Sequence, residues 1–219
     1  MKRLLLILLI LVSFAAFSQQ EVMTTGYKYI KNDVAAWSVS SGTFVNGGTF
    51  PNDYIRCNVA GVMSIPSTQA YGEWYFDFYK GADANTMEVA FIASAVGDQT
   101  TYNGYFFRFF GTGESVRISR STIGSVTSLF VTATEYCANT TWYQFKITRS
   151  ATGVFTAYVK GGVYGNIWTL ISVAGGVGTN PATDNTYTTS IYLTFKAMAG
   201  DRIANVRFKL STGYNTVIK

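Results

Sequence analysis

Nine consecutive residues decide the fold of this chain: Gly72-Glu73-Trp74-Tyr75-Phe76-Asp77-Phe78-Tyr79-Lys80. Apolar Trp74, Phe76 and Phe78 alternate with the polar or amphipathic side chains between them. Because successive side chains of a β-strand point to opposite faces, this alternation predicts a strand with one face in a core. The same period recurs, with aromatic enrichment, in residues 105–110, 142–149, 154–160, 191–197 and 203–210. The sequence therefore predicts an all-β protein.

The spacing of the predicted strands indicates how they are arranged. From residue 54 onward they follow one another about every ten residues, over residues 54–59, 63–65, 72–80, 87–95, 105–110, 115–120, 142–149, 154–160, 168–173, 191–197 and 203–210. Glycine-containing loops at 111–114 and 150–153 predict hairpins, and residues 26–50 predict one or two short edge strands. This spacing is typical of an antiparallel sandwich or barrel, formed here as a single domain over residues 19–219.

The N-terminus has the pattern of a secretory signal peptide, residues 1–18. A charged start, Met1-Lys2-Arg3, precedes an apolar run and then the small residues Ala16 and Ser18. This pattern places the cut before Gln19, with no cysteine there to accept a lipid. The apolar run is shorter than the about 20 residues that a membrane helix needs, which favours a cleaved signal peptide. An uncleaved membrane anchor is the alternative. We expect a secreted protein, outside the cell or at its surface, with no membrane span in the mature chain.

Charge and the absence of histidine exclude several classes of function. The chain has 17 Lys and Arg against 12 Asp and Glu, and removal of Lys2 and Arg3 leaves 15 − 12 = +3. These basic residues are scattered, so we expect no nucleic-acid partner. With no histidine, the chain lacks the usual general base, both common nucleophilic triads and the commonest metal ligand.

Cys57 and Cys137 are the two cysteines. Export to an oxidising compartment makes a disulfide between them one alternative. Two separate buried thiols are the other. Neither alternative implies catalysis.

Three stretches, GEWYFDFYKG (72–81), NTTWYQFKITRSATGVFTAYVKGG (139–162) and YLTFKAMAGDRIANVRF (192–208), carry a resemblance. Their order resembles the concanavalin A-like lectin/glucanase superfamily, including laminin G-like modules, over about residues 42–210. The segments TNPATDNTYTTS (179–190) and AGDRIANVRF (199–208) also look like the ends of secreted or structural proteins of bacteria and uncultured phages. The resemblance implies a two-sheet antiparallel β-sandwich, a jelly roll, in which one concave sheet holds an extended glycan.

Because the superfamily includes glucanases, the carboxyl groups of this sequence can be compared with those that glycoside hydrolysis needs. Glu73 and Asp77 share a strand face but lie about 13 Å apart along it, whereas glycosidases need carboxyl groups about 5–10 Å apart. The glucanases of the superfamily carry Glu, Asp and Glu at alternate positions, and Tyr75 occupies the middle position here. A cross-strand partner such as Glu88 would have to complete the pair. We therefore expect no enzyme, and a glycoside hydrolase or polysaccharide lyase is the third hypothesis.

Binding remains as the leading hypothesis. Sugar rings stack on aromatic side chains and their hydroxyls bind carboxylates and guanidinium groups. The candidate ligand-binding residues, expected to line one groove, are Glu73, Tyr75, Asp77, Tyr79, Arg108 and Phe110. Ordinary packing on a solvated sheet is the alternative for each of them. Trp74, Trp142, Phe145 and Phe195 are predicted to lie in the core.

Two further alternatives stay open. Calcium needs six to eight oxygen ligands, and its candidate ligands, which are equally typical of turns, are Asp83, Asn85, Asp98, Asn180, Asp184 and Asn185. No cofactor is predicted beyond this. The leading hypothesis is a secreted, non-catalytic module that binds carbohydrate at a cell surface or on extracellular polysaccharide. Its competitor is a self-assembling, homo-oligomeric surface, fibre or virion protein, in which residues 19–25 and 215–219 exchange as strands.

Overall fold

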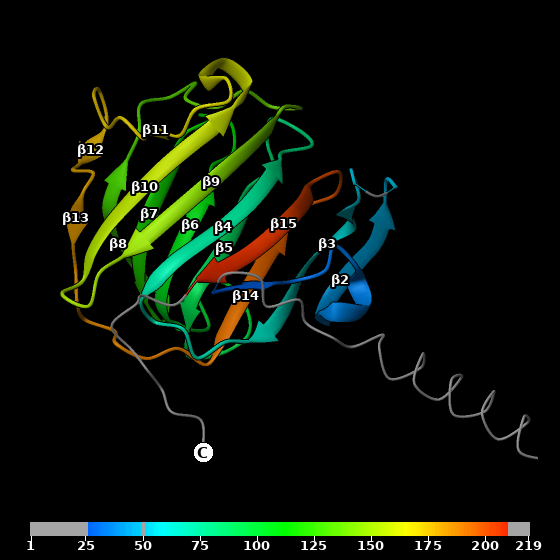
Figure 1. Ribbon diagram of the computed structural model, residues 1–219, viewed down its shortest axis with the longest axis horizontal. Helices are drawn as coiled ribbons and strands as arrows, with labels where there is room; N and C mark the ends of the chain where they lie inside the picture. Colours follow the sequence, from blue (N-terminus) through cyan, green and yellow to red (C-terminus); the bar gives the residue numbers. More distant parts are fainter. Residues whose placement is uncertain (1–25, 50, 210–219) are drawn as a thin grey trace, which may run out of the picture.

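The computed structural model describes residues 26–49 and 51–209 (Figure 1). Over these residues the chain forms antiparallel strands and two short 3-10 helices, η2 (Val34–Ala36) and η3 (Gly162–Tyr164). The strands are β1 (Tyr27–Tyr29), β2 (Ser38–Gly47), β3 (Tyr54–Pro66), β4 (Gly72–Tyr79), β5 (Met87–Ala93), β6 (Asn103–Phe109), β7 (Val116–Thr122), β8 (Ser125–Val131), β9 (Trp142–Arg149), β10 (Val154–Gly161), β11 (Thr169–Leu170), β12 (Val177–Gly178), β13 (Ala182–Thr183), β14 (Tyr192–Ala197) and β15 (Arg202–Lys209). None of the described residues belongs to a helix that is long and apolar enough to cross a membrane. The predicted signal peptide and the two predicted exchange segments lie outside the described residues.

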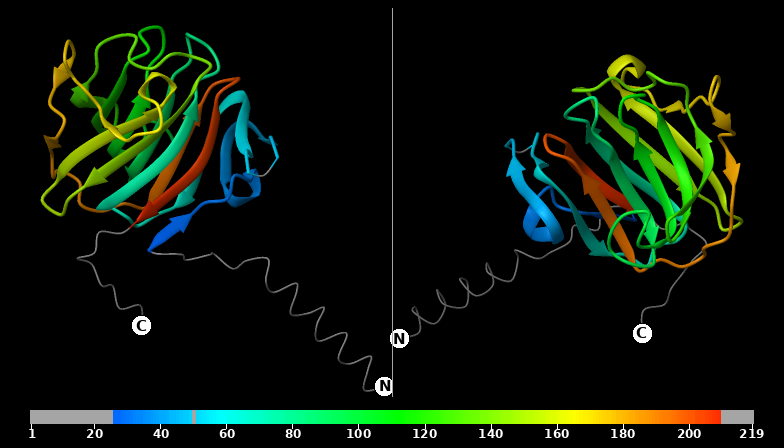
Figure 2. Two further views of the ribbon diagram at one scale, coloured as in Figure 1. Left: turned by 45° about the horizontal axis from the view of Figure 1, so that its top comes forward. Right: turned by 180° about the vertical axis from the view of Figure 1, so that it is seen from behind.

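The strands form two layers (Figure 2). Sheet I has the order β11-β10-β9-β4-β15, with β1 beside β15 and β13 beside β10. Sheet II has the order β14-β5-β6-β7-β8-β12. The predicted all-β, two-sheet antiparallel sandwich is confirmed.

Strand β3 belongs to both sheets. Near its start, Ile55 pairs with Ile203 of β15 in sheet I. Near its end, Ile65 pairs with Leu193 of β14 in sheet II. β2 runs along the remaining edge of β3, so the β2-β3 pair forms the side of the sandwich where the chain passes from one layer to the other (Figure 1).

The core lies between the inner faces of the two sheets. Aromatic rings of sheet I meet those of sheet II with centroids 5.1–5.6 Å apart, in the pairs Trp74–Phe91, Phe76–Phe107 and Phe78–Phe195. Burial of each such side chain stabilises the native state by about 1.5–3 kcal/mol. The predicted core positions of Trp74, Phe145 and Phe195 are confirmed.

The hairpins are confirmed, but several strand bounds differ from the prediction. β6 pairs with β7 and β9 with β10 across the two predicted loops. At Gly153, with φ of 81°, a Cβ would lie 2.6 Å from the Asp184 carbonyl oxygen, so glycine is required there. The predicted strands 54–59 and 63–65 are one strand, β3, and 168–173 contains only the two-residue β11. β2 is ten residues long rather than short, and β8 was not predicted.

Candidate functional site

The outer face of sheet I is centred on β4. The alternation that places three aromatic side chains of β4 in the core turns the side chains between them outward. The outward side chains are four of the predicted ligand-binding residues, Glu73, Tyr75, Asp77 and Tyr79. Their common face is confirmed.

A row of aromatic and basic side chains crosses this face through Tyr75. In successive strands, Tyr158 stands opposite Lys146, and Lys146 opposite Tyr75. Tyr75 then stands opposite Arg207, and Arg207 opposite Tyr29. The Lys146 ammonium lies 4.1 Å from the centre of the Tyr158 ring, and the Arg207 guanidinium carbon lies 4.5 Å from that of Tyr75. Cations at these distances are attracted to ring faces, so cation–π contacts order the row.

Trp168, which lies between η3 and β11, packs onto this row. Its ring centroid lies 5.9 Å from that of Tyr75 in an edge-on arrangement. The ammonium groups of Lys146 and Lys160 lie 5.7 and 5.4 Å from the centre of the indole. Tyr75 is only 8% exposed, whereas Trp168 and Tyr158 are partly exposed. Beside Lys146 and Lys160, the rings that a ligand can reach are therefore those of Trp168 and Tyr158, while Tyr75 packs against the indole as a buried support.

Asp77 provides the polar centre beside this row. The side-chain amides of Gln144 and Asn205 donate to its Oδ2 at 3.0 and 2.8 Å. None of the described residues donates to its Oδ1. Burial raises the pKa of Asp77, against the opposing effect of these two hydrogen bonds and of the charges on Arg207 and Lys160. Asp77 is thus a buried carboxyl group held by neutral amides.

The face does not contain a pair of carboxyl groups at hydrolytic spacing. Glu73 accepts a hydrogen bond from the Tyr75 hydroxyl at 2.5 Å, and about 13 Å of strand separates Glu73 from Asp77. The neighbours of β4 are β9 and β15, so Glu88, which the sequence left open as a cross-strand partner, does not complete the pair. Glu88 belongs to β5 in sheet II and pairs with Arg108.

A second aromatic group surrounds Arg202 at the end of β4. The guanidinium carbon lies 4.3 Å from the centre of the Tyr79 ring and 4.9 Å from that of Tyr54. The Trp142 ring lies 5.6 Å from Tyr79 and 6.0 Å from Tyr54. The prediction that Trp142 is a core residue is wrong. As the first residue of β9 it stands opposite Tyr79 on the outer face and is partly exposed.

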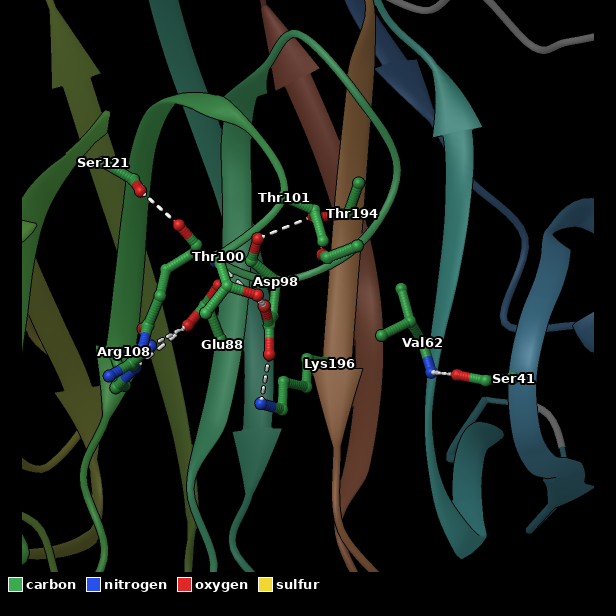
Figure 3. Close-up of polar contacts among 12 residues, drawn as sticks. Ser41, Val62, Glu88, Asp98, Thr100, Thr101, Arg108, Ser121, Thr194 and Lys196 are labelled. Atoms are coloured by element: carbon green, nitrogen blue, oxygen red, sulfur yellow. Dashed lines mark hydrogen bonds and ion pairs between the residues drawn. The ribbon is translucent and has the colours of Figure 1, made fainter. Parts of the chain in front are cut away.

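Arg108 and Phe110 lie on the other side of the molecule. β6 belongs to sheet II, and the side chains that alternate with its core residues point away from the shared core. The prediction of one groove that contains both Arg108 and Tyr75 is therefore wrong. Arg108 is buried and donates from Nε at 3.0 Å, and from Nη2, to Glu88 Oε2 (Figure 3).

The β5–β6 loop, residues 94–102, covers part of this outer face of sheet II (Figure 3). Lys196 of β14 donates to Asp98 at 2.7 Å, and the Tyr102 hydroxyl donates to Glu88 at 2.7 Å. Burial alone would raise the pKa of Asp98, but hydrogen bonds, led by that of Lys196, lower it to about 2. The loop is thus fixed to sheet II at its middle, through Asp98, and at its end, through Tyr102.

The two cysteines are separate. Cys57 and Cys137 are both buried and free, and the Cys57 thiol donates to the Val59 carbonyl oxygen at 3.2 Å. Burial raises the pKa of Cys57 to about 11 and also raises the pKa of Cys137. Of the two sequence alternatives, the structure has the separate thiols and not the disulfide.

The side chains considered for calcium have protein partners. Asp184 accepts hydrogen bonds from Tyr105 and Arg120, and the amide of Asn180 bonds both backbone groups of Ala157. In the described part of the chain, no three Asp, Glu or Cys side chains are grouped so as to hold a metal ion. Asp184 and Asn180 therefore anchor their loops to the sandwich.

Comparisons with known proteins define the fold. No family model and no curated protein matches the sequence. Among solved structures, the carbohydrate binding module CBM66 from Bacillus subtilis is similar with a TM-score of 0.56 and 14% identity, over 82% of this chain and 97% of that chain. The chain has the concanavalin A-like lectin/glucanase fold. The jelly roll that the sequence predicted is confirmed.

Two further structures show how widely this fold is used. A legume lectin-like domain from Entamoeba histolytica has a TM-score of 0.53 and 8% identity, over 84% of this chain and 96% of that chain. The β-glucanase of Bacillus licheniformis has a TM-score of 0.52 and 12% identity, over 86% of this chain and 94% of that chain. Because lectin-like domains and a glucanase share the fold, the side chains must decide between binding and hydrolysis.

Sequence reasoning did not include Trp168, Lys146 and Arg207 in the site. Lys146 and Arg207 occupy polar positions of predicted strands, so alternation placed them on an outer face. Which outer face depends on the pairing of β9 and β15 with β4, which no local pattern shows. For Trp168 we find no sequence signal, because its position depends on how the segment after η3 packs on the sheet.

Proposed function

We propose that this protein is a non-catalytic module that binds carbohydrate on the outer face of sheet I. The observation that carries the proposal is the pair of accessible rings, Trp168 and Tyr158, beside the hydrogen-bonding side chains of Gln144, Lys160 and Asp77. The apolar face of a sugar ring stacks on such rings, and its hydroxyls bind amides, ammonium groups and carboxylates. The fold shared with CBM66 and a legume lectin-like domain supports this function.

The carboxyl groups favour binding over hydrolysis. A glycosidase needs one carboxyl group as an acid and another as a base or nucleophile across one glycosidic bond. Glu73 is hydrogen-bonded to Tyr75, and Asp77 is held by two amides about 13 Å further along the strand. These positions suit contacts to a bound sugar better than attack on its glycosidic bond.

The proposed place of action is outside the cell. It rests on the signal-peptide pattern of residues 1–18. Mass spectrometry of the protein recovered from the medium of an expressing culture tests it. A mature chain that begins at Gln19 is expected, and retention of the intact N-terminus in the cell would contradict it.

The binding proposal is tested with immobilised neutral and acidic glycans and two variants, Trp168→Ala and Tyr158→Ala. The matched control is Ile167→Ala, because this neighbour of Trp168 is 77% exposed. We expect each site variant to lose at least about tenfold in affinity, or about 1.4 kcal/mol, and the control to bind as the wild type does. Equal binding by Trp168→Ala, or a folded protein that no glycan retains, would contradict the proposal.

Self-assembly is a second candidate, favoured by the edge formed by β2. Among the described residues, β2 pairs only with β3, and most of its side chains are exposed. Val39 and Val59, one on each strand, are 41% and 58% exposed. An open edge of this kind is a template for another strand. Light scattering over a hundredfold concentration range tests it: association that Val39→Lys abolishes supports assembly, and a constant monomer mass opposes it.

A further inference from the structure

A row of charged side chains crosses the outer face of sheet II. In successive strands, Lys196 of β14 stands opposite Glu88 of β5, Glu88 opposite Arg108 of β6, and Arg108 opposite Arg117 of β7. The row therefore holds three cations and one carboxylate. Like charges directly opposite each other destabilise a sheet, so the Arg108–Arg117 position is unfavourable as it stands.

Two of the three cations have an acidic partner. Lys196 donates to Asp98 of the covering loop at 2.7 Å, and Arg108 pairs with Glu88. Within residues 26–49 and 51–209, no group accepts a hydrogen bond from the side chain of Arg117, and its Nε is buried without a partner. Burial, followed by the charge of Arg108, lowers the pKa of Arg117 to about 10. Arg117 is therefore still protonated at neutral pH.

Aromatic rings hold the two arginines in place. The guanidinium carbon of Arg117 lies 4.3 Å from the centre of the Phe110 ring, and that of Arg108 lies 4.8 Å from the centre of the Phe106 ring. Arg108 also lies 5.5 Å from the centre of the Phe110 ring. Phe110 and Arg117 are both partly exposed, at the end of the row beyond Arg108. The unpaired guanidinium is thus oriented by packing before any ligand arrives.

A guanidinium of this kind has a definite chemical complement. The guanidinium of Arg117 is partly exposed and has no acceptor among the described residues, so its remaining N–H groups are free to donate charged hydrogen bonds to a ligand. The planar fork of arginine matches the two oxygens of a carboxylate or sulfate. We propose that Arg117, with Arg108 beside it, binds the carboxylate or sulfate group of an acidic saccharide, while the exposed edge of Phe110 contacts the sugar ring. This site is separate from the proposed glycan face, which lies on sheet I.

The test measures binding of four probes by calorimetry: tetragalacturonate, a sulfated carrageenan oligosaccharide, neutral cellotetraose and sodium sulfate. The variants are Arg117→Gln, Arg117→Lys and the control Arg56→Gln, which removes the same charge from an exposed position of β3. We expect Arg117→Gln to lower the affinity for an acidic oligosaccharide at least about tenfold, as for loss of one charged hydrogen bond. Arg117→Lys should fall between this variant and the wild type, because it keeps the charge without the fork. Arg56→Gln should bind within about twofold of the wild type.

The choice of probe identifies the group that is bound. Binding of tetragalacturonate alone assigns the carboxylate, and binding of the carrageenan oligosaccharide, with competition by sodium sulfate, assigns the sulfate. Absence of binding by both acidic oligosaccharides, equal binding by Arg117→Gln and the wild type, or an equal loss in Arg56→Gln overturns the proposal. The Arg117 Nε–H resonance of isotope-labelled wild type is a second readout, which shifts on binding and needs no variant. Neutral cellotetraose separates the two sites, because it carries no charge and Arg117→Gln should leave its interaction with the sheet I face unchanged.

Discussion

The two outer faces of the sandwich have similar strand chemistry and different surroundings. On sheet I, Lys146 lies over the partly exposed ring of Tyr158 and Arg207 over the buried ring of Tyr75. Asp77 is held there by two neutral amides. On sheet II the carboxylate of Glu88 is fully buried against Arg108 beneath the loop 94–102. Loop length contributes to the difference: four residues join β9 to β10, whereas nine join β5 to β6 and fold back over their sheet. The sheet I face is open to ligand contact around Trp168, whereas on sheet II the loop covers the Glu88–Arg108 ion pair and leaves only the end of the row, at Phe110 and Arg117, partly exposed.

The largest expected difference between the faces is the cost of removing a carboxylate. Glu88→Ala leaves Arg108 buried without its acid and beside Arg117, which should destabilise the protein by about 3–5 kcal/mol. Glu73→Ala on the open face removes a partly exposed group with one hydrogen bond and should cost about 1 kcal/mol. Urea unfolding of both variants gives the comparison. Similar costs would show that Glu88 is not acting as the buried counter-charge.

The next effect concerns the hydroxyl of Tyr75, the residue whose ring packs against Trp168. Tyr75→Phe removes the hydroxyl that donates to Glu73 and leaves the ring in place, so a loss of about 1 kcal/mol in the free energy of unfolding is expected. Tyr158→Phe is the control, since no described residue bonds its hydroxyl, and it should change stability by less than about 0.5 kcal/mol. An unchanged stability in Tyr75→Phe would mean that its hydrogen bond to Glu73 contributes nothing to folding.

The fold was predictable where one side of a strand is buried throughout. Along β9 every second residue is buried, so alternation alone gave its bounds correctly. β3 was divided in two because the residues around Val59 are exposed where the strand passes between the sheets. β8 was missed because its exposed positions do not alternate with buried ones. Period-two reasoning thus fails at the rim of the sandwich, where a strand has no continuous inner face.

For the site, the sequence predicted which side chains point outward from each strand, but not which strands lie in the same sheet. Alternation correctly turned Tyr75 and Arg108 outward from their strands. It carries no information on which sheet a strand joins, and that depends on pairing between distant segments, such as β4 with β15. The supposed groove therefore separated into two faces. Trp168 and Arg117, which carry the two proposals, became distinguishable only through their three-dimensional neighbours.

A smaller effect concerns the attachment of the covering loop. Asp98→Asn should cost about 0.5 kcal/mol at pH 7, because its ion pair with Lys196 is partly exposed. The pKa of Asp98 is lowered from 3.8 to about 2, so between these values the unfolded chain binds more protons than the native protein. The stabilisation is therefore present above about pH 4 and lost as the pH falls towards 2. Urea unfolding from pH 7 to pH 2 should show the wild type and the variant converging, and a constant difference would contradict this assignment.

The smallest expected effect, within about 1 kcal/mol, concerns Asp77 on the face of sheet I. Its contribution to the change of stability with pH should have the opposite sign to that of Asp98. Burial raises the pKa of Asp77, so the native protein holds this proton more tightly than the unfolded chain and is destabilised when the carboxyl ionises. That destabilisation is present at neutral pH and disappears as the pH falls through the raised pKa towards 3.8. Asp77→Asn keeps an oxygen for the amides of Gln144 and Asn205, and should be at least as stable as the wild type at pH 7, with an advantage that shrinks in acid. A variant less stable than the wild type at pH 7 would show that Arg207 and Lys160 stabilise the charge more than burial opposes it, and the two faces would then hold their carboxylates in the same way.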